Sequence, residues 1–274
     1  MTIPEARAVE IGVILPTSTP DPSRPILGNV RASARLAEQL GLDSVWSTDH
    51  LIASAPMLDS TVVLATAAAV TDRIQVGFNV LLLALRPVAW AAKQIATLQY
   101  ISGNRLILGV GTGNPAHGDI GWRAAGVSFA GRGERTDAAL RLLPDLVEGR
   151  PATLPDGTEA RLSPGAPMPP VLVAGNGTRA RIRAATYGDG WMVLQPDVAR
   201  LPADLVELRR LAAERERPEP GVTVVAPRLP GELVQAAGLL AEYATLGVER
   251  VILAPTSPDW ERDYDFAAQV RGAL

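Results

Sequence analysis

The stretch Leu40-Gly41-Leu42-Asp43-Ser44-Val45-Trp46-Ser47-Thr48-Asp49-His50 contains a complete passage from helix to strand. Apolar residues recur at helical spacing before it, and Gly41 follows the last of them as a helix C-cap. The segment Ser44–Ser47 predicts a strand, and it leads directly into Asp49 and His50. In an α/β barrel the carboxyl ends of the strands carry the functional side chains, so His50 is a candidate site residue. The alternative is a histidine satisfied by hydrogen bonds in a loop.

The same plan occurs again near the other end of the chain, in Leu246-Gly247-Val248-Glu249-Arg250-Val251. In both places a helix ends at leucine, is capped by glycine, and reverses through an acidic residue into a strand. The sequence therefore predicts at least two units of the same architecture.

Strand-like and helix-like patterns alternate throughout, as in a parallel sheet wrapped by helices. We predict eight strands, at Ile11–Leu15, Ser44–Ser47, Ile74–Val80, Leu106–Val110, Val171–Ala174, Trp191–Leu194, Val222–Ala226 and Val251–Ala254. Helical patterns lie at Gly28–Leu40, Leu58–Val70, Val88–Ile101, Glu134–Val147, Thr178–Tyr187, Ala203–Arg215 and Glu232–Leu246. Eight alternations in 274 residues fit a (β/α)8 TIM barrel better than a doubly wound open sheet. We predict an α/β fold, a parallel eight-stranded barrel that forms a single domain over residues 1–274.

Composition narrows the class of function. Hydrophobic residues make up 47% of the chain and charged residues 20%, which is typical of a globular protein with a buried core. The net charge is −3 and the arginines are scattered, which argues against nucleic acid or an anionic membrane as partner and favours a small molecule. The chain has no cysteine, the N-terminal Met1–Glu10 lacks the pattern of a signal peptide, and no apolar run is long enough to span a membrane. We expect a cytoplasmic protein.

Two connections are too long to be simple turns. Gly111–Gly133 leaves the carboxyl end of the predicted fourth strand, so we expect it to overhang the site. Gly149–Pro170 follows a helix and is rich in proline and glycine, which indicates a structural crossover or a short insertion.

The predicted fourth strand ends in Gly109-Val110-Gly111-Thr112-Gly113-Asn114. This run is not a dinucleotide fingerprint, because no helix opens directly after it and Asn114 replaces the third glycine. Its glycines remove side chains where a planar ligand approaches the backbone, while Thr112 and Asn114 supply hydrogen bonds. A strand exit without a ligand is the alternative.

The predicted fifth strand is followed by Gly175-Asn176-Gly177-Thr178, at the start of a helix. Free backbone N–H groups and the positive end of the helix dipole converge there, which favours phosphate binding, and late loops of such barrels often hold phosphate. Arg179, Arg181 and Arg183 lie nearby, at alternate positions that cannot all face one ligand. A plain helix cap is the alternative.

Three further features complete the candidate site. The third strand ends in Gly77-Phe78-Asn79, where a glycine within a strand indicates a bulge or close backbone approach, and Asn79 is a candidate site residue. His117, in the long loop, is interpreted as a solvated side chain. Two histidines without paired carboxylates argue against a metal site, and no G-x-S-x-G elbow of a hydrolase is present.

The order of these motifs resembles the bacterial luciferase-like monooxygenase superfamily over nearly the whole chain. The resemblance rests on Trp46–Leu51, on Arg86-Pro87 before a helix, on Arg105–Asn114, on Gly131-Arg132-Gly133-Glu134-Arg135 before another helix, and on Pro169–Trp191. Within the superfamily, the Asp-His pair and the Gly-Thr-Gly run are most similar to the branch that uses the deazaflavin coenzyme F-420.

The resemblance implies a cofactor, F-420 or alternatively FMN, across the carboxyl ends of the strands. Its ring would lie near His50, near the bulge at Gly77, Phe78 and Asn79, and near Gly111–Asn114, and its phosphate at Gly175–Thr178. The resemblance also implies a non-proline cis peptide near the bulge, a homodimer, and a proton donor or acceptor at His50, with Asp49 beside it as the second catalytic candidate.

One position departs from the family pattern. Sugar-phosphate dehydrogenases of the deazaflavin branch carry glutamate where this chain has Asn114, which argues against a sugar phosphate as substrate. The leading hypothesis is hydride transfer between F-420 and a small organic substrate. The alternatives are an FMN-dependent monooxygenase that uses molecular oxygen and a catalytically silent flavin-binding barrel.

Overall fold

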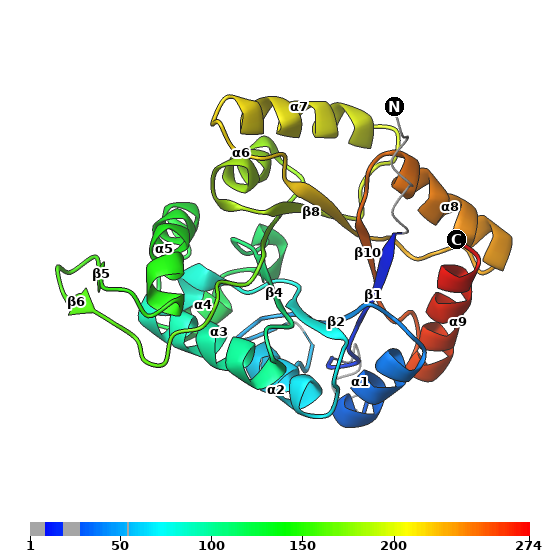
Figure 1. Cartoon of the computed structure of the whole chain (residues 1–274), viewed down its shortest axis with the longest axis horizontal. Coiled ribbons are helices and arrows are strands. Elements are labelled where there is room, and N and C mark those ends of the chain that lie inside the picture. The colour runs from blue at the N-terminus through cyan, green and yellow to red at the C-terminus, as the bar shows by residue number, and fades with distance from the viewer. Residues whose placement is uncertain (1–8, 19–27, 54) are drawn as a thin grey trace.

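Eight parallel strands close into a barrel in the computed structural model, which describes residues 9–18, 28–53 and 55–274 (Figure 1). Around the ring the order is β1-β10-β9-β8-β7-β4-β3-β2, and closure is made by β1 beside β10, with Glu10 opposite Arg250. The barrel strands are β1 (Glu10–Ile14), β2 (Ser44–Ser47), β3 (Gln75–Phe78), β4 (Leu106–Val110), β7 (Val171–Ala174), β8 (Gly190–Leu194), β9 (Gly221–Val225) and β10 (Arg250–Leu253).

Helices surround the barrel on its outside, as Figure 1 shows. They are α1 (Val30–Gln39), α2 (Ser60–Ala69), α3 (Val88–Ser102), α5 (Arg132–Val147), α6 (Thr178–Tyr187), α7 (Leu201–Ala213), α8 (Leu233–Thr245) and α9 (Trp260–Gly272). Local chemistry fixes their ends. The side chain of Asn29 accepts hydrogen bonds from two N–H groups of the first turn of α1, and Gly103 ends α3 with φ 64°.

The predicted TIM barrel is confirmed, and each predicted strand matches an observed one closely at its ends. The main difference is at β3, which we expected to continue to Val80 and which ends at Phe78. The peptide bond between Asn79 and Val80 is cis, and beyond it Leu81 still pairs with Val110 of β4 in an isolated parallel bridge. The non-proline cis peptide expected near Gly77 and Phe78 is therefore present at the next residue pair.

The seven predicted helices are all present. The C-terminal helix α9 was not expected, although its buried side chains Trp260, Tyr264, Ala267 and Val270 recur at helical spacing. Short elements also lie in the loops: the 3-10 turns η1 (Leu83–Leu85) and η2 (Pro115–His117), the helix α4 (Ile120–Ala124), and the hairpin strands β5 (Ala152–Thr153) and β6 (Glu159–Ala160).

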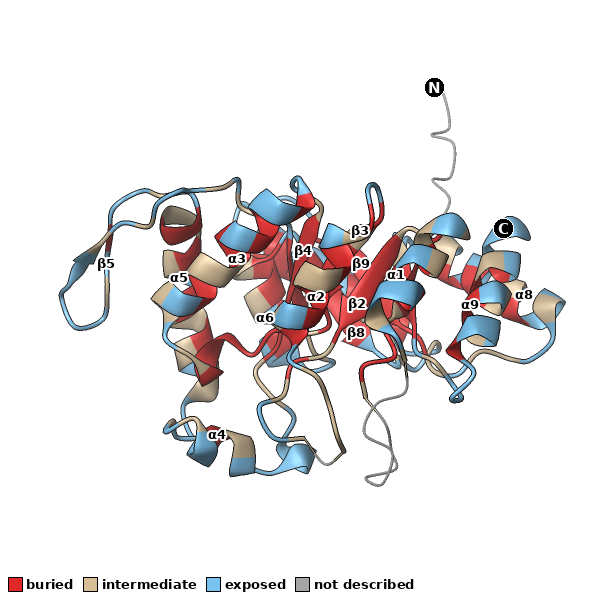
Figure 2. Ribbon diagram, turned by 90° about the horizontal axis from the view of Figure 1, so that it is seen from below, coloured by how far each residue is buried: buried red, intermediate tan, exposed pale blue. Residues whose placement is uncertain are grey.

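Both long connections are placed as expected. Gly111–Gly133 carries η2 and α4, and Figure 2 shows α4 below the barrel, on the side of the loops that follow the strands. Gly149–Pro170 carries the β5–β6 hairpin, which projects from the flank in the same view. The second connection is therefore a short insertion remote from the strand ends.

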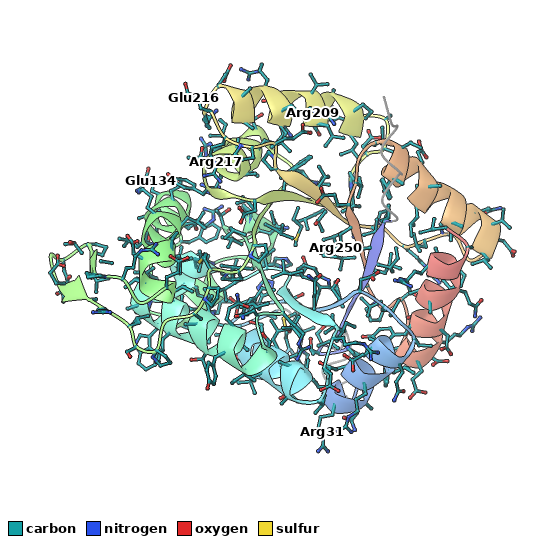
Figure 3. The ribbon with its side chains drawn as sticks, viewed as in Figure 1. Arg31, Glu134, Arg209, Glu216, Arg217 and Arg250 are labelled. Carbon is teal, nitrogen blue, oxygen red and sulfur yellow. The ribbon has the colours of Figure 1, made fainter. Side chains whose placement is uncertain are left out.

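Trp46 fills the barrel interior and is completely buried. Two glycines make room for it, since a Cβ at Gly12 would lie 2.5 Å from the indole nitrogen and a Cβ at Gly77 would lie 2.3 Å from the ring. The indole N–H donates to Ser44 Oγ over 2.8 Å. At the amino ends of the strands Arg250 bonds to Glu10 and to Gln75, and it lies inside the ring in Figure 3. This end of the barrel is thus packed and ion-paired, which leaves the other end for a site.

Candidate functional site

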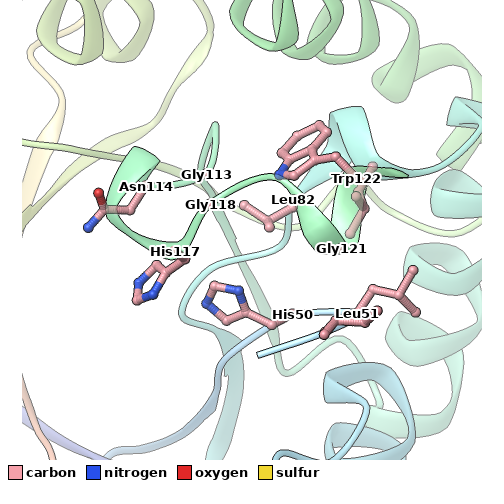
Figure 4. A pocket seen from close by; sticks show the side chains of 11 residues that line it. His50, Leu51, Leu82, Gly113, Asn114, His117, Gly118, Gly121 and Trp122 are labelled. Carbon is pink, nitrogen blue, oxygen red and sulfur yellow. The ribbon is translucent and has the colours of Figure 1, made fainter. Parts of the chain in front are cut away.

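The loops after β2, β3 and β4 converge on a small cavity at the carboxyl end of the barrel (Figure 4). Its volume is about 20 Å³, which is room for a single water molecule. The lining residues include His50, Leu82, Leu85, Gly113, Asn114, His117 and Trp122. The structure therefore brings His50 and the glycine-rich turn together, as the sequence predicted.

Asp49 is buried beside this cavity, and both of its oxygens are engaged. The Arg86 guanidinium donates to Oδ1 over 2.9 Å and to Oδ2 over 2.7 Å, the Leu82 N–H donates to Oδ2 over 2.9 Å, and Ser60 Oγ donates to Oδ1 over 3.3 Å. Four hydrogen bonds from three donor groups fix this carboxylate, and through it they hold three segments in place. This geometry gives Asp49 a positioning role, and direct catalysis by it stays a prediction from the sequence.

His50 is half-buried, and its ring meets that of His117 edge to face, with centroids 4.9 Å apart and planes at 74°. Burial lowers the pKa of His50 below its ordinary value, the neighbouring His117 lowers it further, and Asp49 opposes the shift. The imidazole is therefore neutral at neutral pH and has a nitrogen that can accept a proton. His117 is exposed, as expected of a solvated side chain, but it is also the direct neighbour of His50.

The residues at the end of β3 have different environments. Gly77 faces Trp46 within the barrel, and Phe78 is completely buried in the core between the strands and the helices. Neither lines the cavity that holds His50, and both pack within the barrel wall; their predicted place beside a cofactor stays a prediction. Asn79 is 8% exposed at the mouth, and its N–H donates to the Ser47 carbonyl over 2.8 Å.

The turn after β4 is shaped by close contacts. A Cβ at Gly111 would lie 2.3 Å from Val80. Gly113 has φ 84°, and a Cβ there would lie 2.9 Å from the Trp122 ring. Asn114 caps η2 by accepting a hydrogen bond from the Ala116 N–H over 3.0 Å. Glycine is needed here because the neighbouring side chains fill the space a larger residue requires.

A second and much larger cavity, about 740 Å³, adjoins this turn. Thr112 contributes to its wall, together with the beginnings of α5 and α6. The motif Gly131-Arg132-Gly133-Glu134 lines it from α5, and Gly175, Gly177 and Arg179 line it from α6. Two helix N-termini thus face one cavity, an arrangement that favours an anionic ligand.

In the segment Gly175–Thr178, the glycines line the cavity and the two polar side chains are bonded elsewhere. Gly175 and Gly177 line the cavity, and Gly175 has φ 132°. The Asn176 amide is occupied by β8, since it donates to the Leu194 carbonyl over 2.7 Å and accepts from the Leu194 N–H over 2.9 Å. Thr178 Oγ1 accepts from Arg181 over 3.3 Å. The backbone and not the side chains of this turn therefore faces the cavity.

No protein group among the described residues accepts from the N–H groups of Thr178 and Arg179, and no side chain caps the helix. These N–H groups are the orphan donors of a helix start, and they are available to a bound anion.

The three arginines of α6 have separate roles, as their alternate spacing predicted. Arg181 is buried and paired with Glu207 at 2.8 Å and Asp204 at 3.1 Å, and Arg183 is paired with Asp137 of α5. Arg179 is exposed, lines the cavity, and has no ion-pair partner among the described residues. Arg179 is therefore the cation available to a ligand at this helix start.

Sequence reasoning missed Arg86 and Trp122 as parts of the site. Arg86 is the partner of Asp49, at 2.7 Å, and Trp122 covers the glycine turn from α4. Neither has a local signal that reveals its contact, because each reaches the site across a loop. The part of the chain that the structure describes has no cluster of metal-ligating side chains and no helix long and apolar enough to cross a membrane.

Comparisons with known proteins give a family match and several relatives. A family model described as luciferase-like monooxygenase matches residues 9–230. An uncharacterized protein of Mycobacterium tuberculosis is 34% identical over 170 residues, which is 60% of this chain and 58% of that protein's length. An F-420-dependent glucose-6-phosphate dehydrogenase of Kineococcus radiotolerans is 35% identical over 182 residues, which is 60% of this chain and 52% of the dehydrogenase.

Solved structures extend the likeness in fold to almost the full chain. An F-420-dependent secondary alcohol dehydrogenase in complex with an F-420-acetone adduct has a TM-score of 0.80 at 17% identity, covering 96% of this chain and 98% of the other. A riboflavin lyase with modified FMN and riboflavin has a TM-score of 0.81 at 15% identity, covering 98% and 91%. At such identities the likeness shows the fold alone.

Proposed function

This chain belongs to the luciferase-like monooxygenase family, and from that premise we propose that it is an oxidoreductase that transfers a hydride between coenzyme F-420 and a small organic substrate. Relatives named for F-420-dependent reactions support the choice of cofactor, among them the glucose-6-phosphate dehydrogenase of Kineococcus radiotolerans.

The larger cavity fits the phosphate-bearing part of such a cofactor. Its volume of about 740 Å³ lies within the range of small-molecule sites, about 300–1,000 Å³. The free N–H groups of Thr178 and Arg179 and the guanidinium of Arg179 would hold the phosphate, and the space beside Gly177 leaves the approach open.

The cofactor ring would lie between this cavity and His50. The supporting observation is that neighbouring residues of one turn line both cavities: Thr112 faces the larger one, and Gly113 and Asn114 face the smaller one with His50. This observation carries the proposal, because it joins an anion-binding helix start to a proton-accepting imidazole through a single short segment.

The protein's own contribution to the reaction is orientation and a proton. A bound F-420 supplies the hydride chemistry. His50, neutral because burial lowers its pKa, accepts the substrate's proton at an imidazole nitrogen and returns it in the reverse direction. Asp49 and Arg86 hold the segment that carries His50, and Asn114, which cannot donate a proton as a carboxylic acid does, serves by hydrogen bonding.

The decisive experiment measures binding of purified protein to F-420 and to FMN, followed by stopped-flow detection of oxygen consumption by each reduced complex. We expect tighter binding of F-420 and no oxygen consumption. Tighter binding of FMN with oxygen consumption would replace the proposal by a monooxygenase. Binding of either cofactor without turnover of any of a panel of alcohols, aldehydes, hydroxy-carboxylic acids and oxo-carboxylic acids would favour a silent flavin-binding barrel.

The phosphate subsite has its own test. Arg179→Ala together with Gly177→Pro should weaken cofactor binding, because the first change removes the unpaired cation and the second changes the backbone at the helix start. Arg31→Ala is the matched control, since that arginine is exposed on α1 and does not line this cavity. A homodimer, a cytoplasmic location and a single domain over residues 1–274 stay predictions from the sequence.

A further inference from the structure

A third cavity, about 520 Å³, lies at the carboxyl ends of β8, β9 and β10, and no motif of the sequence pointed to it. Residues just beyond these strands line it, and the first turns of α9 supply the other wall. Its lining includes Gln195, Arg228, Leu229, Arg262 and Phe266. The carboxyl ends of all barrel strands lie on one side, so this cavity opens on the same end of the barrel as His50.

Two arginines and one aspartate line the cavity, so its charged side chains carry a formal net charge of +1. Arg228 and Arg262 are exposed and have no ion-pair or hydrogen-bond partner for their guanidinium groups among the described residues. A guanidinium that is not already committed offers two parallel N–H donors to a carboxylate.

The acidic residue in the wall is already engaged. Asp263 accepts hydrogen bonds from the Thr256 N–H at 2.7 Å, from Thr256 Oγ1 at 3.0 Å and from the Ser257 N–H at 3.2 Å. It is the only carboxylate among the described residues that line the cavity. Its carboxylate braces the loop after β10 and is not paired with either arginine.

The backbone of Gln195 is a second indication of a ligand. It has φ 45°, in the left-handed region, directly after β8, and its N–H is held by the Val225 carbonyl at 2.7 Å. The other described non-glycine residues with positive φ, Asn104 and Glu216, lie just after helices, where this conformation is a common way to end a helix. A non-glycine residue held this way at a strand end that lines a cavity is typical of a functional site.

Apolar residues form much of the remaining wall, beside Thr256 and Ser257. Leu229 and Phe266 are half-buried, and Pro227, Pro230 and Pro255 add rigid apolar surface. A ligand that satisfies this cavity has an anionic group for the arginines and a hydrophobic body for the rest.

We propose that this cavity binds an organic carboxylate with an apolar body and, resting on the proposed function, that such a carboxylate is the substrate class of the enzyme. The carboxylate lies between Arg228 and Arg262, Gln195 donates a hydrogen bond from its amide, and the apolar part packs on Leu229 and Phe266.

Calorimetric titration of the cofactor-free protein with 4-phenylbutyrate tests the site directly. We expect binding, with 4-phenylbutan-1-ol at least about tenfold weaker because it lacks the charge. The double substitution Arg228→Ala with Arg262→Ala should weaken the binding of 4-phenylbutyrate about tenfold or more. Arg31→Ala with Arg35→Ala, two exposed arginines of α1, is the charge-matched control and should leave binding unchanged; Arg31 points away from the barrel in Figure 3.

The outcomes separate the two proposals. Absence of 4-phenylbutyrate binding, equal binding of the alcohol, or equal loss in the control variant overturns the carboxylate site, even where F-420 binds. Binding of 4-phenylbutyrate that depends on the two arginines supports the carboxylate site. If such binding is found but F-420 does not bind, the site stands and only the assignment of the carboxylate as substrate is overturned. With F-420 bound, a panel of hydroxy- and oxo-carboxylic acids should show a raised KM in the Arg228→Ala, Arg262→Ala variant with little change in kcat.

Discussion

The mouth of the barrel has two sides that differ in construction. On the side of β2, β3 and β4, which we call the closed side, the cavity holds about 20 Å³ and Asp49 accepts four hydrogen bonds. On the side of β8, β9 and β10, the open side, the cavity holds about 520 Å³ and two arginines have no partner among the described residues.

The closed side and the open side meet two different requirements of an enzyme. A group that exchanges protons must be held in one orientation, and packing with hydrogen bonds achieves that at the closed side. A charged group that selects a ligand must be free to contact it, so it must not already form an ion pair with another side chain of the protein. We expect substitutions on the closed side to affect stability or the chemical step and those on the open side to affect ligand binding alone.

The largest effect should follow His50→Ala. Without the imidazole the proton has no acceptor, so F-420-dependent turnover should fall by about 10²- to 10⁴-fold. Steady-state kinetics on a responsive substrate measures the loss, and F-420 affinity within about twofold of the parent protein shows that the site is intact. Unchanged turnover would remove His50 from the mechanism and leave the closed side with a purely structural role.

Asp49→Ala should reduce the free energy of unfolding by about 3 kcal/mol, because it leaves the largely buried Arg86 guanidinium and the Leu82 N–H without their acceptor. Urea denaturation measures the change. Arg262→Ala on the open side is the comparison, and it should alter stability by less than about 0.5 kcal/mol. Similar losses in both variants would erase the contrast between the two sides.

Gly109→Ala tests the close approach of β3 and β4 beneath the closed side. The new Cβ would lie 2.0 Å from the Phe78 carbonyl oxygen, which is backbone and cannot swing aside, so we expect a loss of about 2 kcal/mol. Gly238→Ala in α8 has open space around it and should raise stability by about 0.5 kcal/mol or more. Thermal unfolding of both variants measures the pair, and a stable Gly109→Ala protein would show that the strands can separate.

The smallest effect concerns the two histidines. His117→Ala should raise the pKa of His50 toward its ordinary value of 6.5, because one of the two causes that lower it disappears. Titration by NMR of the His50 ring measures the shift. Because the pKa of His50 is lowered in the folded state, the stability linked to this group is complete above pH 6.5. It is lost as the pH falls from 6.5 through the folded-state pKa. In that pH interval the parent protein should lose more stability than the variant. An unchanged titration would show that the rings do not interact.

The sequence predicted the barrel well because strand burial and helix caps are local signals. Gly41 has φ 75° at the end of α1, as its position after Leu40 indicated. The C-terminal helix was missed although the spacing of Trp260, Tyr264 and Ala267 indicates a helix, since charged residues between them lower the apolar signal.

The site was predictable in position but not in the roles of its members. Whether Arg179, Arg181 or Arg183 faces the cavity depends on acids of α5 and α7, far away in sequence. In the same way Asp49 and His50 are neighbours in sequence, yet one is locked by Arg86 and the other faces His117. Such differences are set by tertiary contacts, for which a single sequence holds no local pattern.

The closure of the ring by β1 and β10 has a consequence for how the protein forms. Glu10 and Arg250 are paired across 240 positions of the chain, so β1 gains its second neighbour only after β10 has emerged from the ribosome. Contacts of such long sequence separation slow folding, and until they form the edge of β1 is a template for wrong pairing. Chaperone dependence during synthesis is therefore expected to be governed by the last strand and not by the residues of the site.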